Sequence, residues 1–346
     1  MRKNFLYGFC FCLLLLAGCV NKDVADVDKI KVEIEKKRFE EDFFEIDTSQ
    51  LEASLGLLQK KYPSFYIDFR DRILGLTEMD SAQKNLAIKR FFNDYKSVYD
   101  SSKNLEKGIE EAFLYITKGL KYVRYYFPDY KTPKQFITFI GPMDAFAYGE
   151  TGGSGEIITE NALCSGIQLH MGSEFSLYKT DLGQQLYPAY ISRKFTTAYI
   201  ASNSIKNIID DIYSPLAAEK TLLDILIDHG KRMYLLDLFM PFEKEEIKLG
   251  YTSGQLNGAK ENEGYIWNFL TENNLLYESD ILRIRSFVTD GPLTSELGIG
   301  SPGFISLFVG KQIIYAYLKQ NPGVSPQQLL KLDAKQILSG SQYRPR

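Results

Sequence analysis

Histidine is scarce in this sequence, and its scarcity limits the metal chemistry that the side chains could support. The 346 residues include two histidines, His170 and His229. Neither begins an H-E-x-x-H sequence, which would place two imidazoles one helical turn apart on a zinc ion, with a glutamate beside them. His170 is followed by Met171, and His229 by Gly230. A metal site based on histidine would therefore have to recruit distant carboxylates.

Serine and cysteine show no activating pattern either. No G-x-S-x-G sequence is present, since Ser154 stands in Gly-Ser-Gly and Ser301 precedes Pro302. We interpret Cys164 as a small core residue, because it lies just before an apolar segment. The pair of carboxylates that a glycosidase needs can be neither shown nor excluded from sequence. The residue types alone therefore predict no reaction, and we expect neither enzyme activity nor a cofactor or metal.

The N-terminal segment carries the clearest chemical signal. Arg2 and Lys3 precede an apolar run over residues 5–17, which Leu16-Ala17-Gly18-Cys19 closes. The run is shorter than the roughly 20 apolar residues of a membrane-spanning helix and is typical of a secretory signal. Its ending resembles a lipobox, in which the cysteine is acylated, for example with palmitate, and becomes the first mature residue. We therefore predict a signal peptide over residues 1–18 and lipid attachment at Cys19, where two or more acyl chains give stable anchoring.

Net charge and cysteine content restrict the kinds of protein and fold that remain. The formal net charge is −3 and becomes more negative when Arg2 and Lys3 are removed, so there is no basic field for nucleic acid. Cys10 and Cys12 leave with the signal, and Cys164 alone cannot form an intrachain disulfide. The fold must therefore be held by its core. Residues 19–37 predict a lipid-anchored tether that ends in an edge strand over residues 31–34.

From residue 47 onward the apolar period is helical, and one apolar stripe extends over residues 109–123. Strands are predicted over residues 136–140 and 166–170, separated by a glycine-rich loop or hairpin that lacks the Lys and Ser/Thr of a phosphate loop. Further helices are predicted over residues 184–204, from Ser214-Pro215 to Tyr234, from Gly254 through Trp267, from Ser301-Pro302 to Asn321, and after a capping box from Ser325 to Gln328. Residues 38–346 therefore predict one mainly α domain with a small β-sheet, an α+β fold.

Several segments together resemble the gliding motility lipoprotein GldB family of the Bacteroidetes. The most specific is residues 177–195, and the others follow it in order: Thr221 to Tyr234, Leu249-Gly-Tyr-Thr252, Asn262 to Trp267, Leu275-Leu-Tyr277, Ser301-Pro-Gly303 and Val309-Gly-Lys-Gln312. The resemblance runs from the lipobox nearly to the C-terminus. It implies a role in the gliding machinery and the secretion apparatus tied to it.

That family is in turn similar to predicted zinc peptidases with a thermolysin-like layout, in which a helix bearing H-E-x-x-H precedes a second helix with a glutamate ligand. Here residues 184–204 would be the first helix, and its positions around Tyr187 cannot bind zinc. The second helix has Asp228-His229-Gly230 where the glutamate and glycine would stand. The resemblance thus implies a zincin-like scaffold without metal, and a remnant cleft around Tyr187, His229, Glu263 and Trp267.

We therefore expect a non-catalytic envelope lipoprotein that contacts the membrane through its lipid and other envelope proteins of the gliding and secretion machinery. We place it on the outer membrane facing the periplasm, with the inner membrane and the cell surface as alternatives. A divergent metallopeptidase or other hydrolase is the first functional alternative, and a ligand-capturing surface lipoprotein is the second.

Overall fold

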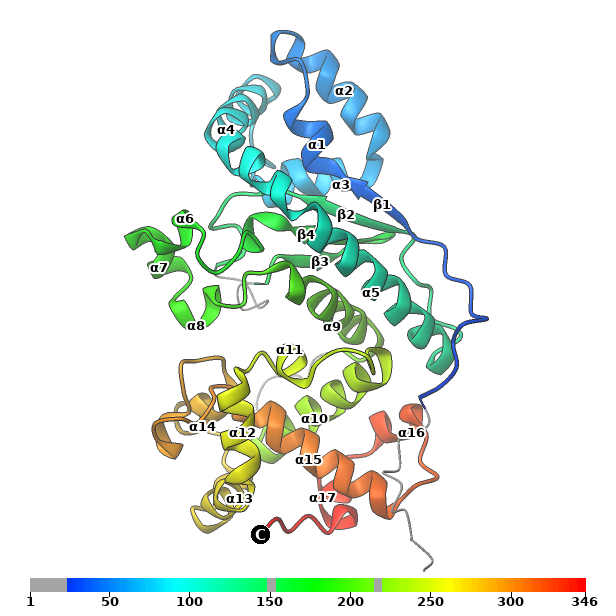
Figure 1. The fold of residues 1–346 in the computed structure, drawn as a ribbon, viewed down its shortest axis with the longest axis vertical. Coiled ribbons are helices and arrows are strands. Elements are labelled where there is room, and N and C mark those ends of the chain that lie inside the picture. Colours follow the sequence, from blue (N-terminus) through cyan, green and yellow to red (C-terminus); the bar gives the residue numbers. More distant parts are fainter. Residues whose placement is uncertain (1–23, 148–153, 215–219) are drawn as a thin grey trace, which may run out of the picture.

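The chain folds into a mainly helical structure with a small sheet, as the sequence predicts. The computed structural model describes residues 24–147, 154–214 and 220–346. Cys19 and the predicted signal peptide lie outside these ranges. Figure 1 shows two halves, which we call the sheet half (residues 24–214) and the C-terminal half (residues 220–346).

Four strands form the sheet in the order β1-β2-β4-β3. The strands are β1 (Glu35–Arg38), β2 (Gln135–Phe139), β3 (Glu156–Ile158) and β4 (Ala162–Gly166). β1, β2 and β4 run parallel, whereas β3 is an antiparallel edge strand that pairs Ile157 with Cys164. The strand predicted at residues 136–140 is therefore confirmed to within one residue.

The helices of the sheet half pack around these strands. They are α1 (Phe39–Phe44), α2 (Leu51–Lys61), α3 (Pro63–Asp68), α4 (Ser81–Ser102), α5 (Glu106–Tyr126), α6 (Ser176–Lys179), α7 (Asp181–Leu186), α8 (Ala189–Ser192) and α9 (Ile200–Ile212). α9 packs on β3 and β4, and α5 packs on α9. The apolar stripe of α5 faces inward, since Ile109, Ile116, Leu120 and Val123 are fully buried.

The C-terminal half is made of helices and connecting turns. Its helices are α10 (Leu222–Phe239), α11 (Glu245–Leu249), α12 (Ser253–Glu261), α13 (Glu263–Glu272), α14 (Ile281–Val288), α15 (Ile305–Gln320), α16 (Pro326–Lys331) and α17 (Ala334–Ser341). The predicted capping box is confirmed, because the Ser325 hydroxyl accepts from the Gln328 N–H at the start of α16.

Two predicted strands are displaced. The strand expected at residues 166–170 is β4, which ends at Gly166 and is followed by a 3₁₀ turn over Ile167–Leu169. All five residues of β4 are buried, so it has no alternation from which its start could be predicted. The edge strand expected at residues 31–34 is β1, four residues later, whose charged Lys36 and Arg38 form ion pairs with α5. The ordered fold therefore begins inside the predicted tether of residues 19–37.

Four predicted helices have different boundaries. Residues 184–204 do not form one helix, because Pro188 disfavours helical geometry at Tyr187, and the chain turns again before α9 begins at Ile200. The helix expected from Ser214-Pro215 begins at Leu222, where Thr221 provides the capping box. The helix expected from Gly254 through Trp267 is divided at Asn262 into α12 and α13. α15 begins at Ile305 rather than at Pro302, because Phe304 adopts a left-handed conformation (φ +59°).

The core of the C-terminal half depends on a close crossing of α10 and α15. A Cβ added to Gly230 would lie 2.2 Å from the Gly310 carbonyl oxygen, and a Cβ added to Gly310 would lie 1.9 Å from the Leu226 carbonyl oxygen. Leu226, Ile313 and Ile314 are fully buried in the same core. The two backbones therefore touch at this point, and no side chain larger than hydrogen fits between them.

We predict that Gly310→Ala lowers the free energy of unfolding by about 3 kcal/mol or more, because the added methyl overlaps backbone that cannot yield. Gly56 is the matched control, since it lies inside α2, is exposed and has nothing within 4 Å of an added Cβ. Gly56→Ala should raise the free energy of unfolding by about 0.5–1 kcal/mol through helix propensity. Urea denaturation measures both, and equal effects of the two substitutions would contradict the close crossing.

Candidate functional site

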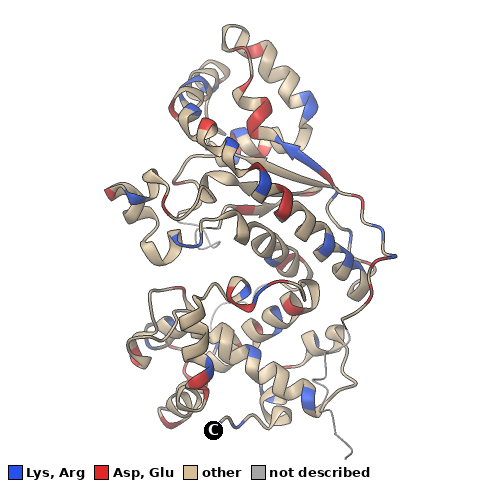
Figure 2. Cartoon of the chain, viewed as in Figure 1, with Lys and Arg blue, Asp and Glu red and all other residues tan. Residues whose placement is uncertain are grey.

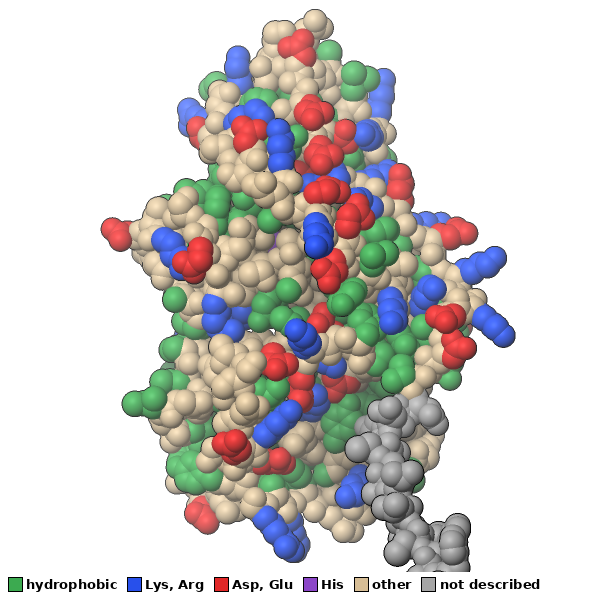
Figure 3. Space-filling view, viewed as in Figure 1, with side chains coloured by type: hydrophobic (Ala, Val, Ile, Leu, Met, Phe, Trp, Pro, Cys, Tyr) green, Lys and Arg blue, Asp and Glu red, His purple; other side chains and the backbone are tan. Residues whose placement is uncertain are grey.

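One candidate site is a cavity of about 1130 Å³ between the two halves. From the sheet half it is lined by Ser154 to Glu156, by His170 and by α9; from the C-terminal half it is lined by α10, the start of α14, and residues around Asp290 and Phe304. Charges of both signs are interspersed over the two halves (Figure 2), and the face in Figure 3 shows no broad field of one sign. Any charge-based selectivity must therefore come from individual residues of the cavity.

Glu156 is the most connected polar residue of the cavity wall. Its buried carboxylate contacts the His170 Nε2 at 2.5 Å and accepts from the hydroxyls of Ser154 (2.6 Å) and Ser165 (2.8 Å) and from the Asn203 amide (3.1 Å). Burial alone would raise the pKa of Glu156, but the interactions with His170 and the two serines outweigh it and lower the pKa. Glu156 is therefore held as a carboxylate with its oxygens engaged.

Arg232 joins the two halves across the cavity. Its guanidinium pairs with Asp228 on the same helix, at 2.8 Å, and with Asp210 on α9. The Nη2 of Arg232 is buried without a hydrogen-bond partner in the described ranges, and the guanidinium lies over the Tyr213 ring, 5.0 Å from its centroid. The α9–α10 junction thus holds paired charges that retain spare bonding capacity.

His229 lines the same cavity as a neutral base. Its Nδ1 lies 2.8 Å from the Ser306 hydroxyl, and its ring packs edge-on against Phe304, with centroids 5.2 Å apart. Burial lowers the pKa of His229 to about 4. His229 is partly buried, whereas Leu226 and Ile227 on the same helix are buried.

The four residues predicted around a remnant cleft do not come together. Tyr187 is fully buried and donates to the Met143 carbonyl (2.8 Å), whereas Glu263 accepts from Gln312 (3.0 Å) and Tyr343 (2.8 Å). Trp267 packs on the ring of Tyr343, with centroids 5.0 Å apart. Of the four residues, only His229 is among the residues that line the cavity.

The residues that sequence reasoning missed lie on α9. Asn203, Lys206, Asn207 and Asp210 line the cavity, while Ile200, Ile205, Ile208 and Ile209 are buried. This polar stripe at three- and four-residue spacing was a readable signal, but the predicted helix ended at residue 204. Glu156 gave no such signal, because it stands in a strand of three residues. Cys164 lies fully buried in β4, where burial raises the pKa of its thiol, which fits a core residue.

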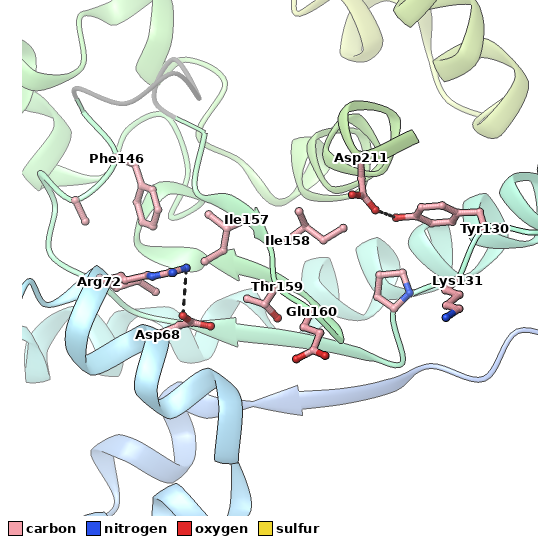
Figure 4. Close-up of a pocket in the computed structure, with 13 residues that line it drawn as sticks. Asp68, Arg72, Tyr130, Lys131, Phe146, Ile157, Ile158, Thr159, Glu160 and Asp211 are labelled. Carbon is pink, nitrogen blue, oxygen red and sulfur yellow. Dashed lines mark hydrogen bonds and ion pairs between the residues drawn. The ribbon is translucent and has the colours of Figure 1, made fainter. Parts of the chain in front are cut away.

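A second cavity, of about 740 Å³, lies beside the edge strand β3 (Figure 4). Ile157, Ile158 and Phe146 give it an apolar wall. At its rim Arg72 contacts Asp68 at 3.4 Å, and the Tyr130 hydroxyl donates to Asp211 at 2.7 Å. It is a groove along a sheet edge rather than a cluster of reactive groups.

Comparison with known families gives one match, which covers nearly the whole chain. Residues 20–345 match the family described as gliding motility protein GldB. The chain therefore belongs to this family, as its sequence resemblance predicted, and is a lipoprotein-type component of gliding motility. No curated protein and no solved structure matches the chain.

The segments that carried the resemblance have structural roles. Gly230 and Gly310 form the crossing of α10 and α15, and Gly250 ends α11 with a φ of +73° that glycine adopts readily. Thr252 provides the capping box of α12. The described helices include none long and apolar enough to cross a membrane. In the same ranges no three His, Cys, Asp or Glu residues are placed to share a metal ion.

We predict that His229 makes folding stability dependent on pH between about 6.5 and 4. The unfolded histidine takes up a proton below its ordinary pKa of 6.5, whereas the folded one resists protonation down to about 4. Stability is therefore full above pH 6.5 and declines as the pH falls, by about 1–2 kcal/mol at pH 5 after allowing for partial solvent contact.

The measurement compares urea denaturation of the wild type and of His229→Gln from pH 7.5 to 4.5. The variant keeps a polar group opposite Ser306 but cannot titrate, so its stability should fall less over this window. Parallel pH profiles of the two proteins would show that burial does not perturb His229.

Proposed function

We propose that this protein is a lipid-anchored envelope component of the gliding machinery and of the secretion apparatus tied to it, and that it acts through protein contacts without catalysis. Family membership supports the gliding role. The lipobox-like ending at Cys19 supports the anchor. We place the protein on the outer membrane facing the periplasm, where an acylated cysteine can hold a soluble fold at the bilayer surface.

One observation carries the non-catalytic part of the proposal: each of the four carboxylates that line the cavity forms an ion pair with a basic residue of the chain. Glu156 contacts His170, Asp210 and Asp228 contact Arg232, and Asp290 contacts Lys194. A general base needs an oxygen that is free to reach a substrate proton, and a nucleophile needs an adjacent base. His170 directs both ring nitrogens at acceptor oxygens, of Glu156 and Thr196, and so activates no serine.

The cavity side chains of α9 and α10 also do not fit the zinc ion that a peptidase-like layout implies. α9 directs the carboxamide residues Asn203 and Asn207, four positions apart, to the cavity, with Asp228 and His229 on the opposite helix. Protein zinc is bound by Cys, His, Asp and Glu, so two of these four residues are unsuitable. We therefore infer a peptidase-like scaffold without metal. A hydrolase would instead have to break one of these ion pairs, and Asp228, which faces the cavity from α10, is the carboxylate that we test.

We predict that Asp228→Asn restores gliding in a null strain when it is present at wild-type abundance. The amide keeps the shape of the side chain, and Arg232 retains its contact with Asp210. Colony spreading, normalised to protein level by immunoblot, is the measurement. Loss of spreading at normal abundance would favour the hydrolase alternative, and stoichiometric zinc in the purified wild type would favour the metallopeptidase.

We predict that Cys19→Ser abolishes lipid attachment and leaves an uncleaved precursor, because the thiol is the acylation site. Cys12→Ser is the matched control, since that cysteine is removed with the predicted signal and should be processed normally. Intact mass and membrane fractionation distinguish the products. Normal cleavage and membrane association of the Cys19 variant would contradict the anchor.

The interaction role is tested by crosslinking in native envelopes, with a photoreactive residue placed on the open edge of β3. Alternate residues of the edge strand point their backbone N–H and C=O groups away from β4. A strand of a partner protein could pair with these groups and so extend the sheet. Ile158 beside the groove is one probe position, and exposed Lys89 on α4 is the control. Crosslinks to gliding or secretion proteins at Ile158 support the proposal, and their absence argues against this contact surface.

A further inference from the structure

Lys206 is a cation in the cavity wall for which the described part of the chain provides no partner. α9 directs its side chain to the cavity, near the charges of Lys194, Asp290, Glu156 and Asp210. In the ranges that the structure describes, its ammonium forms no ion pair within 4.0 Å and no hydrogen bond. The nearby acids are occupied by other groups, namely Asp290 by Lys194, Asp210 by Arg232 and Glu156 by His170.

An unpaired ammonium at this position opposes folding. Burial and the neighbouring Lys194 lower the pKa of Lys206 to about 8, so the amine is largely charged at pH 7 in surroundings that disfavour the charge. The side chain is partly exposed, and a lysine withdrawn this far from bulk water is usually paired. An apolar residue at this position of α9 would avoid that cost, which points to a partner supplied from outside the chain.

The rest of the cavity indicates what that partner is. Its walls are largely apolar, with Ile209 one turn from Lys206 on α9, Met233 and Leu236 facing from α10, and Phe304 and Leu307 from the start of α15. The Arg232 Nη2 adds a second donor without a partner in the described ranges. A ligand that matches both features carries one anionic group on an apolar body.

We propose that this cavity binds an amphiphilic monocarboxylate of the fatty-acid class, with its carboxylate against Lys206 and its chain along the apolar walls. The cavity, of about 1130 Å³, is large enough for such a molecule. The proposal goes beyond the gliding role and does not depend on it, because it rests on the cavity alone.

The test uses decanoate and decanol, which share the apolar body and differ in the charge. The protein is the chain from residue 20 onward, which contains the matched family region and every residue of the described core, from Val27 to Ile337. Cooperative thermal unfolding of this chain is checked first. Isothermal titration should show saturable binding of decanoate, with decanol weaker by about tenfold or more.

Variants then assign the binding to Lys206. Lys206→Met should bind decanoate about tenfold or more weakly while its thermal midpoint rises by a few degrees, since the partly buried, unpaired charge is gone. Lys206→Arg should retain binding, and Lys89→Met, on the exposed face of α4, should change neither property. Lys206→Gln serves if the Met variant fails to fold. Absence of saturable decanoate binding, equal binding of decanol, or undiminished binding by Lys206→Met would each overturn the proposal.

Discussion

The backbone contact between Gly230 and Gly310 determines the position of almost every group discussed above. With α10 and α15 touching at these glycines, Asp228, His229 and Arg232 all lie within one helical turn of the crossing. His229 reaches Ser306 because α15 begins one turn before Gly310. Since packed helices have few alternative arrangements, a crossing set by backbone contact places these side chains more reproducibly than flexible surface contacts could.

The ion pairs that join α10 to α9 contribute less stability than the crossing of α10 and α15, but they depend more strongly on geometry. Arg232 holds Asp228 and Asp210 from the two halves at once, but Asp210 is half exposed, so solvent screening leaves this pair little net stabilisation. Apolar packing of α10 against α5 and α9 supplies the cohesion between the halves. The ion pairs therefore fix how the halves are aligned across the cavity more than they hold them together.

The sequence predicted the structure where the local pattern agreed with the tertiary contacts. It failed where the two differed. The Ser325 capping box was visible as a motif because it meets a requirement of the backbone itself. Gly230 and Gly310 stood only within the segments that resemble the family, and their contact was not predicted. β4 could not be positioned, since a strand buried on both faces carries no period. The cavity face of α9 was missed because the predicted helix ended at residue 204, whereas α9 continues to Ile212. The pairing of Glu156 with His170 joins a three-residue strand to a loop, and sequence spacing does not encode that contact.

Two ionic clusters of this chain differ in how their charges are paired. Away from the cavity, Asp237 contacts Lys248 (2.5 Å) and Lys311 (2.9 Å) and accepts from the Tyr315 hydroxyl (2.7 Å), and Lys311 also contacts Glu245 (2.8 Å). Although burial would raise the pKa of Asp237, the two lysines outweigh burial and lower it, which is the behaviour of a charge satisfied by its own fold. In the cavity, Lys206 and the Nη2 of Arg232 lack such partners in the described ranges. Both clusters are costly to desolvate, but each charge of the Asp237 cluster has a counter-charge in the fold, whereas Lys206 has none within the described ranges.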